Sequence, residues 1–152
     1  MNKSIIIIIL CVFSANARAD LSIDSPLSFG EITVRNNNSV SSTTITRAGA
    51  QSSTGQILVI KPGTPGVYTL SGLPAYTNVN LSLDIPVSSS MSYADTAQFT
   101  ITAIDLADTV RTDGNGTVQF RMGGTLSTSG NPAENYFSGA EYIIFMNIDM
   151  AY

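Results

Sequence analysis

The chain has 152 residues, of which 43% are hydrophobic and 12% charged, and its formal net charge is −4. It contains one cysteine, no histidine and no tryptophan, so the Ser-His-Asp, Cys-His and histidine-based zinc sites of many hydrolases cannot be assembled from it. Its seven basic residues are outnumbered by eleven acidic ones, which excludes the basic surface that nucleic acids and anionic membranes require.

The N-terminus has the layout of a secretory signal peptide. Lys3 supplies a positive charge, residues 4–13 form an apolar run, and Ala17 to Ala19 provide a small-residue cleavage site. Residues 1–19 are therefore predicted to be a signal peptide, which leaves a single mature domain over residues 20–152. The apolar run is shorter than the roughly 20 residues that cross a bilayer, so no stable membrane insertion is expected.

The mature domain is more acidic than the whole chain and cannot form a disulfide. Removing Lys3 and Arg18 leaves five of the seven basic residues against all eleven acidic ones, a net charge of −6. The single cysteine, Cys11, lies inside the predicted signal peptide. The stability of the domain must therefore come from its core and its hydrogen bonds.

Strand patterns recur along the mature chain between clusters of glycine, proline, asparagine and serine, and no stretch of ten residues has a helical period. Eight strands are expected, over residues 27–34, 43–49, 56–61, 66–73, 78–85, 98–107, 117–127 and 141–152. Short strands separated by turns predict an antiparallel β-sandwich or barrel.

Four segments have more specific expectations. The alternation of apolar residues slips at Gly30, which predicts a β-bulge. The continuous apolar run in residues 56–61 predicts a strand that is covered on both faces or central in a sheet. Residues 112–117 predict the turn of a hairpin. Residues 20–26 are either a short strand that ends at Pro26 or a disordered tail.

The closing stretch EYIIFMNIDMAY alternates with a period of two up to its last residue, which predicts a strand with one buried face. The apolar positions of this face are Tyr142, Ile144, Met146, Ile148, Met150 and Tyr152.

Nothing in the sequence points to an active site, and no cofactor is expected. Asp105, Asp108 and Asp113 could together bind calcium, but polar turn residues explain the same pattern. The adjacent glycines of RMGGTL lack the following helix of a phosphate loop, and instead predict a bulge or a close approach of two backbones. Four aromatic residues lie in or beside loops, where they either pack against the domain or stack on sugars: Tyr76, Tyr93, Tyr136 and Phe137.

Several stretches together resemble a known family. They are LSFGEITV, GVYTLSGLPAYTNVNLSL, VQFRMGGTLS and YFSGAEYIIFMNIDMAY. In order and spacing they resemble a bacterial exported family of unknown function, whose members have an FG-I opening, a GGTL segment and a closing alternating run that ends on tyrosine. The resemblance spans nearly the whole mature chain.

That family is similar to the pilin-like subunits of chaperone-usher surface fibres, and the resemblance implies an immunoglobulin-like sandwich that lacks its last strand. In such pilins a neighbouring subunit's N-terminal segment fills the resulting groove. A periplasmic chaperone fills it beforehand and pairs with the C-terminal strand, and an outer-membrane usher is the further partner. The resemblance therefore implies a partner-binding role for Tyr142 to Tyr152 and a donor role for Leu21 and Ile23.

The sequence is compatible with two functions, and neither is enzymatic. The first is a structural subunit of a surface fibre, exported through the periplasm to the cell surface and serving adhesion or biofilm. The alternative is a stand-alone secreted β-sandwich that binds a ligand such as carbohydrate through loop tyrosines, Tyr76 and Tyr136 among them.

Overall fold

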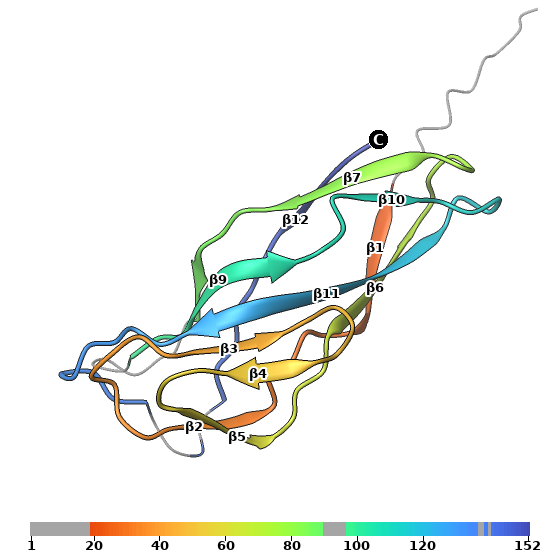
Figure 1. The fold of residues 1–152 in the computed structure, drawn as a ribbon. Coiled ribbons are helices and arrows are strands. Elements are labelled where there is room, and N and C mark those ends of the chain that lie inside the picture. The colour runs from red at the N-terminus through yellow and green to blue at the C-terminus, as the bar shows by residue number, and fades with distance from the viewer. Residues whose placement is uncertain (1–18, 90–96, 137–138, 140) are drawn as a thin grey trace, which may run out of the picture.

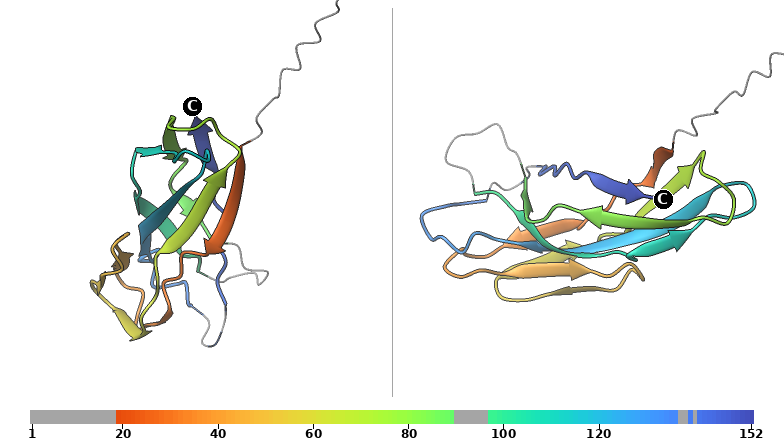
Figure 2. Two further views of the ribbon diagram at one scale, coloured as in Figure 1. Left: turned by 90° about the vertical axis from the view of Figure 1, so that its right-hand side faces the viewer. Right: turned by 90° about the horizontal axis from the view of Figure 1, so that it is seen from above.

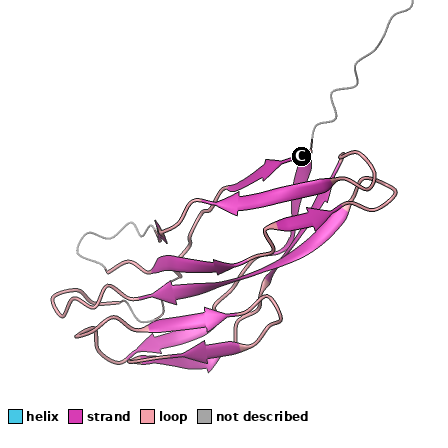
Figure 3. Cartoon of the chain, turned by 45° about the horizontal axis from the view of Figure 1, so that its top comes forward, coloured by secondary structure: helices cyan, strands magenta, loops and turns pink. Residues whose placement is uncertain are grey.

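The protein is an all-β domain in the computed structural model, which describes residues 19–89, 97–136, 139 and 141–152. Its strands are β1 (Asp20–Ser25), β2 (Glu31–Val34), β3 (Ser42–Ile45), β4 (Gln51–Ser53), β5 (Ile57–Lys61), β6 (Gly66–Ser71), β7 (Asn78–Leu83), β8 (Val87–Ser88), β9 (Thr100–Asp105), β10 (Thr109–Arg111), β11 (Val118–Ser127) and β12 (Ile148–Ala151). Loops connect them, and the described residues contain no helix (Figure 3). It follows that no helix in this part of the chain could cross a membrane.

The strands form three antiparallel sheets. The largest follows the order β1-β6-β11-β3-β4, and β9 and β8 extend it from β11. The second sheet has the order β10-β7-β12, and the third consists of β2 and β5. Figures 1 and 2 show the second sheet as a layer along one side of the first. The predicted antiparallel β-sandwich is confirmed: each of the eight expected ranges contains one strand, and β1, β4, β8 and β10 lie outside them.

The main core lies between the first two sheets. Tyr68 and Leu70 of β6 and Phe120 of β11 belong to one buried cluster with Val79 and Leu81 of β7. The period-two pattern places these side chains on facing surfaces. Burying each large apolar side chain contributes about 1.5–3 kcal/mol, so this cluster holds the two layers together.

Strand β11 is central and passes very close to a neighbouring backbone at Gly123. It pairs with β6, β3 and β9. A Cβ atom on Gly123 would collide with the backbone oxygen of Ile45 and would lie 2.6 Å from the backbone nitrogen of Arg47. The close approach predicted for the GGTL segment is therefore present, and only glycine fits at Gly123.

The N-terminal part of the chain clarifies two expectations. Residues 20–25 form a strand, β1, and this strand ends directly before Pro26. Gly30 has a φ of 75°, and the β2–β5 register shifts between Glu31 and Ile32. The pair is therefore irregular close to Gly30, but the extra residue is Ile60 of β5, so the bulge lies on the partner strand and not at Gly30 as predicted.

The prediction for residues 56–61 is wrong. Strand β5 lies in the two-stranded sheet, and two of its apolar side chains, Leu58 and Ile60, are 42% and 51% exposed. Ile57 is buried on the opposite face. The continuous apolar run therefore reflects one packed face and one open face rather than cover on both.

The prediction for residues 112–117 is half right. They form a turn, but it connects β10 to β11, and these strands pair with β7 and β6 instead of forming a hairpin. The cause is Thr112, whose Oγ1 donates to Pro74 O at 2.8 Å and accepts from Thr77 N at 2.8 Å. These bonds tie the turn to the β6–β7 loop and separate the two flanking strands into different sheets.

Candidate functional site

A groove of about 1050 Å³ with an apolar floor lies between two segments from opposite ends of the chain. One wall is made by residues 26–34, which contain β2, and the other by the stretch before β12. The floor consists of Phe99, Ile101 and Leu126, which are 4%, 2% and 6% exposed. The groove therefore opens directly onto the second buried cluster of the domain.

Both walls can offer backbone groups to a further strand. Within the described residues β2 pairs only with β5, so its other edge has no partner strand. On the opposite wall, residues 144–147 lie outside any strand. Unpaired strand edges readily accept another strand, so the groove has the shape and the bonding groups of a strand acceptor.

The rim of the groove is polar at one end. Lys61 lines it, and its Nζ lies 2.6 Å from the Glu31 carboxylate. The hydrogen bond from Lys61 to Glu31 raises the pKa of the lysine, and the negative charge of Glu31 acts in the same direction. Both side chains are more than half exposed, so the pair marks the groove entrance and contributes little to stability.

Side-chain burial alternates along the closing stretch, as predicted. The even positions from Tyr142 to Met150 are half-buried, whereas Ile143 and Phe145 are 48% and 80% exposed. Tyr142, Ile144 and Met146 pack on the groove-floor cluster, and Ile148 and Met150 on the main core. Tyr152 differs from the expectation of a buried face, since it is 57% exposed.

The chain's own β7 lies beside the C-terminal strand. Ile148 pairs with Leu83 and Ala151 with Asn80, and the regular strand covers only Ile148–Ala151. The stretch before it borders the groove instead of continuing the ladder. The predicted partner-binding residues are thus divided, because Tyr142, Ile144 and Met146 line the groove while Ile148 and Met150 do not.

The predicted donor residues lie in β1, which pairs with the chain's own β6. Leu21 is half-buried against the main core, whereas Ile23 is 65% exposed. Asp24 also holds β1 in place, because its carboxylate accepts hydrogen bonds from Thr69 Oγ1 at 2.6 Å and Gln119 Nε2 at 3.1 Å. These hydrogen bonds lower the pKa of Asp24, and the bond from Thr69 has the largest effect.

The two loop tyrosines proposed for ligand binding have different environments. Tyr136 packs against Phe99 with ring centroids 4.2 Å apart, and its hydroxyl accepts from Ser129 N at 2.9 Å and donates to Gln98 O at 3.2 Å. Burial raises the pKa of Tyr136. Tyr136 is therefore part of the packing that closes one end of the groove, whereas Tyr76 is 66% exposed. Tyr93 and Phe137 lie outside the described residues.

The three aspartates considered for calcium do not meet. Asp105 pairs with Arg47 at 3.5 Å, and Asp113 accepts bonds from the backbone of its own turn. The described part of the chain contains no group of three or more acidic, cysteine or histidine side chains that could hold a metal ion.

Comparison with protein families identifies a match over the whole predicted mature domain. The family model described as Domain of unknown function (DUF4402) matches residues 20–152. The chain belongs to the DUF4402 family. Comparisons with curated proteins and with solved structures give no significant match.

Membership of the DUF4402 family agrees with the extent of the domain described above. The matched range begins with β1 and includes both walls and the floor of the groove. A family of unknown function assigns no role to any of these residues, so the role of the groove has to be argued from its geometry.

Sequence reasoning found one wall of the groove but missed its floor. The alternation of the closing stretch indicated Tyr142, Ile144 and Met146. Phe99, Ile101 and Leu126 lie in two other predicted strands, and only the fold brings them together. The sequence feature that could have indicated the groove is the break in apolar alternation at Gly30. A strand that is interrupted there can leave one edge without a partner.

Proposed function

We propose that this protein is a structural subunit of a bacterial surface fibre, a pilus or fimbria, assembled by exchange of β-strands. The groove is the observation that carries the proposal. An extended segment that entered it would lie over an already buried floor, cover the half-buried apolar side chains of the walls, such as Ile32, Ile144 and Met146, and could bond to the open edge of β2. In this mode of recognition the backbone bonds supply affinity and the buried side chains supply specificity.

The proposed occupant is β1 of a second copy. Leu21 and Ile23 alternate on one face of that strand, and Ile23 is mostly exposed where β1 now lies. Moving into a neighbour's groove would bury Ile23, which is worth about 1.5–3 kcal/mol. The exchange also requires β1 to leave β6 and Asp24 to lose its bonds to Thr69 and Gln119, so it competes with self-pairing.

The proposal also includes partners and a location. A periplasmic chaperone would cover the groove and the C-terminal segment before assembly, since an open apolar groove and a free edge promote aggregation. An outer-membrane usher and neighbouring subunits would complete the assembly at the cell surface. The proposal assigns the protein no catalytic activity and no cofactor.

Removing β1 tests the proposal. We expect the chain 20–152 to form oligomers that grow with concentration, and a variant lacking Asp20–Ser25 to lose them, because each subunit would then have a groove and no donor. Leu21→Asn with Ile23→Asn should weaken association by about tenfold or more, since two apolar contacts are lost. The measurement is size-exclusion chromatography with light scattering over a hundredfold range of concentration.

The matched control is Ser22→Asn, which changes the opposite face of β1 and should associate like the wild type. A wild-type chain that stays monomeric throughout this range, or a β1 deletion that associates as strongly as the wild type, would contradict the proposal.

A further inference from the structure

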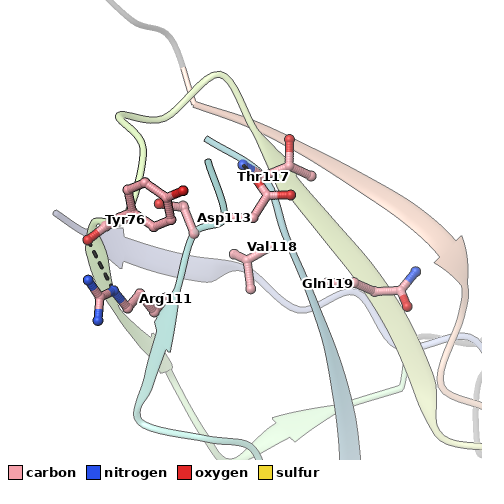
Figure 4. A pocket seen from close by; sticks show the side chains of 7 residues that line it. Tyr76, Arg111, Asp113, Thr117, Val118 and Gln119 are labelled. Atoms are coloured by element: carbon pink, nitrogen blue, oxygen red, sulfur yellow. Dashed lines mark hydrogen bonds between the residues drawn. The ribbon is translucent and has the colours of Figure 1, made fainter. Parts of the chain in front are cut away.

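A second hollow lies away from the groove, where the β6–β7 loop meets the turn between β10 and β11. It has a volume of about 670 Å³, and its walls include Tyr76, Arg111, Asp113 and Gln119 (Figure 4). None of these residues lines the groove. The hollow can therefore have a role of its own, whether or not the fibre proposal holds.

The two loops that form this hollow are fastened to each other. Thr112 is 2% exposed and bonds to Pro74 and Thr77 through its hydroxyl. Tyr76 N donates to Asp113 O at 3.1 Å, and Leu73 N donates to Gly116 O at 3.3 Å. A surface built on these bonds is pre-organised, which lowers the entropic cost of binding a ligand.

Tyr76 is held outward on this surface in an unfavourable conformation. Its φ is 55°, which lies in the left-handed region that residues other than glycine rarely adopt. Holding a residue there costs on the order of 1–3 kcal/mol. The ring is 66% exposed, so the core gains little from it. A Cβ atom on Gly114 would lie 2.8 Å from the Tyr76 hydroxyl. The ring is therefore fixed by its neighbours while it stays accessible to a ligand.

Arg111 places a cation over the ring. Its guanidinium carbon lies 5.9 Å from the centroid of Tyr76, and its Nε donates to Tyr76 O at 3.2 Å. Arg47 and Lys61 have carboxylate partners, but none is found for Arg111 among the described residues. Because Nε and the ring position the guanidinium, its Nη atoms remain as two oriented donors for an anion.

One acceptor, Asp113, lies in the turn that meets Tyr76. Asp113 Oδ1 accepts from Asn115 N at 2.9 Å and Thr117 N at 3.0 Å, which leaves Oδ2 for a ligand. Gln119 points away from Tyr76 and Arg111 in Figure 4, and its amide nitrogen donates to Asp24 of β1. A ligand that carries hydroxyl groups beside its anionic group can donate to Asp113 while it pairs with Arg111.

We propose that this hollow binds an acidic sugar, such as a uronic or sialic acid residue of a glycan. The apolar face of the pyranose ring stacks on Tyr76, the sugar carboxylate pairs with the Nη atoms of Arg111, and a sugar hydroxyl donates to Asp113. A neutral sugar would leave Arg111 without a partner, and an inorganic anion would leave Tyr76 uncovered. Only a sugar that carries a carboxylate uses all the groups that the two loops present.

The test is a titration of the chain 20–152 with glucuronic acid and with N-acetylneuraminic acid, followed by backbone amide chemical shifts. Glucose and inorganic phosphate are the comparison ligands. We expect the acidic sugars to shift the amides of residues 75–77 and 111–119, and Tyr76→Ala to weaken their binding about tenfold. Tyr76→Phe keeps the ring and should bind like the wild type.

Arg111 variants separate charge from stacking. Arg111→Gln should remove the preference for glucuronic acid over glucose, whereas Arg111→Lys should keep part of it because the charge remains without the two-pronged donor. Arg35→Gln, at another exposed cation, should change nothing. The proposal is overturned if neither acid shifts these amides, if glucose binds as well as glucuronic acid, or if Arg111→Gln leaves the preference intact. The Arg111 variants decide the question even if Tyr76→Ala fails to fold.

Discussion

Replacing Ile144 and Ile148 together by lysine is expected to abolish accumulation of the exported protein. Both side chains are half-buried, one over the groove floor and one against the main core. Losing each apolar contact costs about 1.5–3 kcal/mol, and placing an ammonium group there adds a desolvation cost. The sum approaches the total stability of an ordinary domain, about 5–15 kcal/mol. Quantitative immunoblotting of the exported fraction would measure the result.

The opposite face of the same stretch provides the matched control. Phe145 is 80% exposed and does not line the groove, so Phe145→Lys should accumulate close to the wild-type level. Wild-type accumulation of the Ile144 and Ile148 variant would mean that this stretch is neither a core element nor a chaperone-docking element. Equal loss in both variants would mean that a partner covers both faces.

Gly123→Ala is the second change with a large expected effect. The added Cβ would collide with the backbone oxygen of Ile45, and a backbone atom can move aside only if the β3–β11 pairing shifts. Overpacking of this kind costs about 1–3 kcal/mol or more, and we expect the upper end here, a fall of on the order of 10 °C in the unfolding midpoint. Circular dichroism during heating would measure it.

Gly124→Ala is the control for Gly123→Ala. Its Cβ would lie 3.2 Å from Ala103 O and 3.3 Å from the Ile104 side chain, so small movements of neighbours can accommodate it. We expect a loss no larger than about 1 kcal/mol. If the two alanine variants had equal stability, the close approach at Gly123 would not be the reason for its glycine.

Local patterns were enough to predict the fold class and most of the strands. Strand β11 and the turns around it follow from alternation and from residues that favour turns, which depend on neighbours in the sequence. The error at residues 56–61 has a different origin. A run of apolar residues does not reveal whether a second layer covers them, and Leu58 and Ile60 lie on a face that no described layer covers.

The groove could be predicted only in part for the same reason. Alternation indicated that Ile144 and Met146 belong to one face, but their neighbours on the floor come from β9 and β11. The hollow beside Tyr76 could not be predicted from the sequence. Arg111 lies 35 residues further along the chain, and it reaches the ring because Thr112 ties the two loops together. A contact of this kind depends on the whole fold.

The most direct test of strand exchange is a disulfide between two copies. Residues 20–152 contain no cysteine, so one chain can carry Ile23→Cys and the other Ile144→Cys. A disulfide requires Cα atoms closer than about 7 Å, and it forms between these positions only if β1 of one copy lies in the groove of the other. The control partner carries Val40→Cys, which is exposed at a position outside the groove.

The two mixtures are oxidised under the same conditions and compared by non-reducing electrophoresis and mass spectrometry. Strand exchange predicts that the 23–144 pair forms a covalent dimer of two different chains in high yield and that the 23–40 pair forms little. If the 23–144 yield does not exceed that of the 23–40 control, the groove does not receive β1 of a second copy and the proposed assembly is wrong.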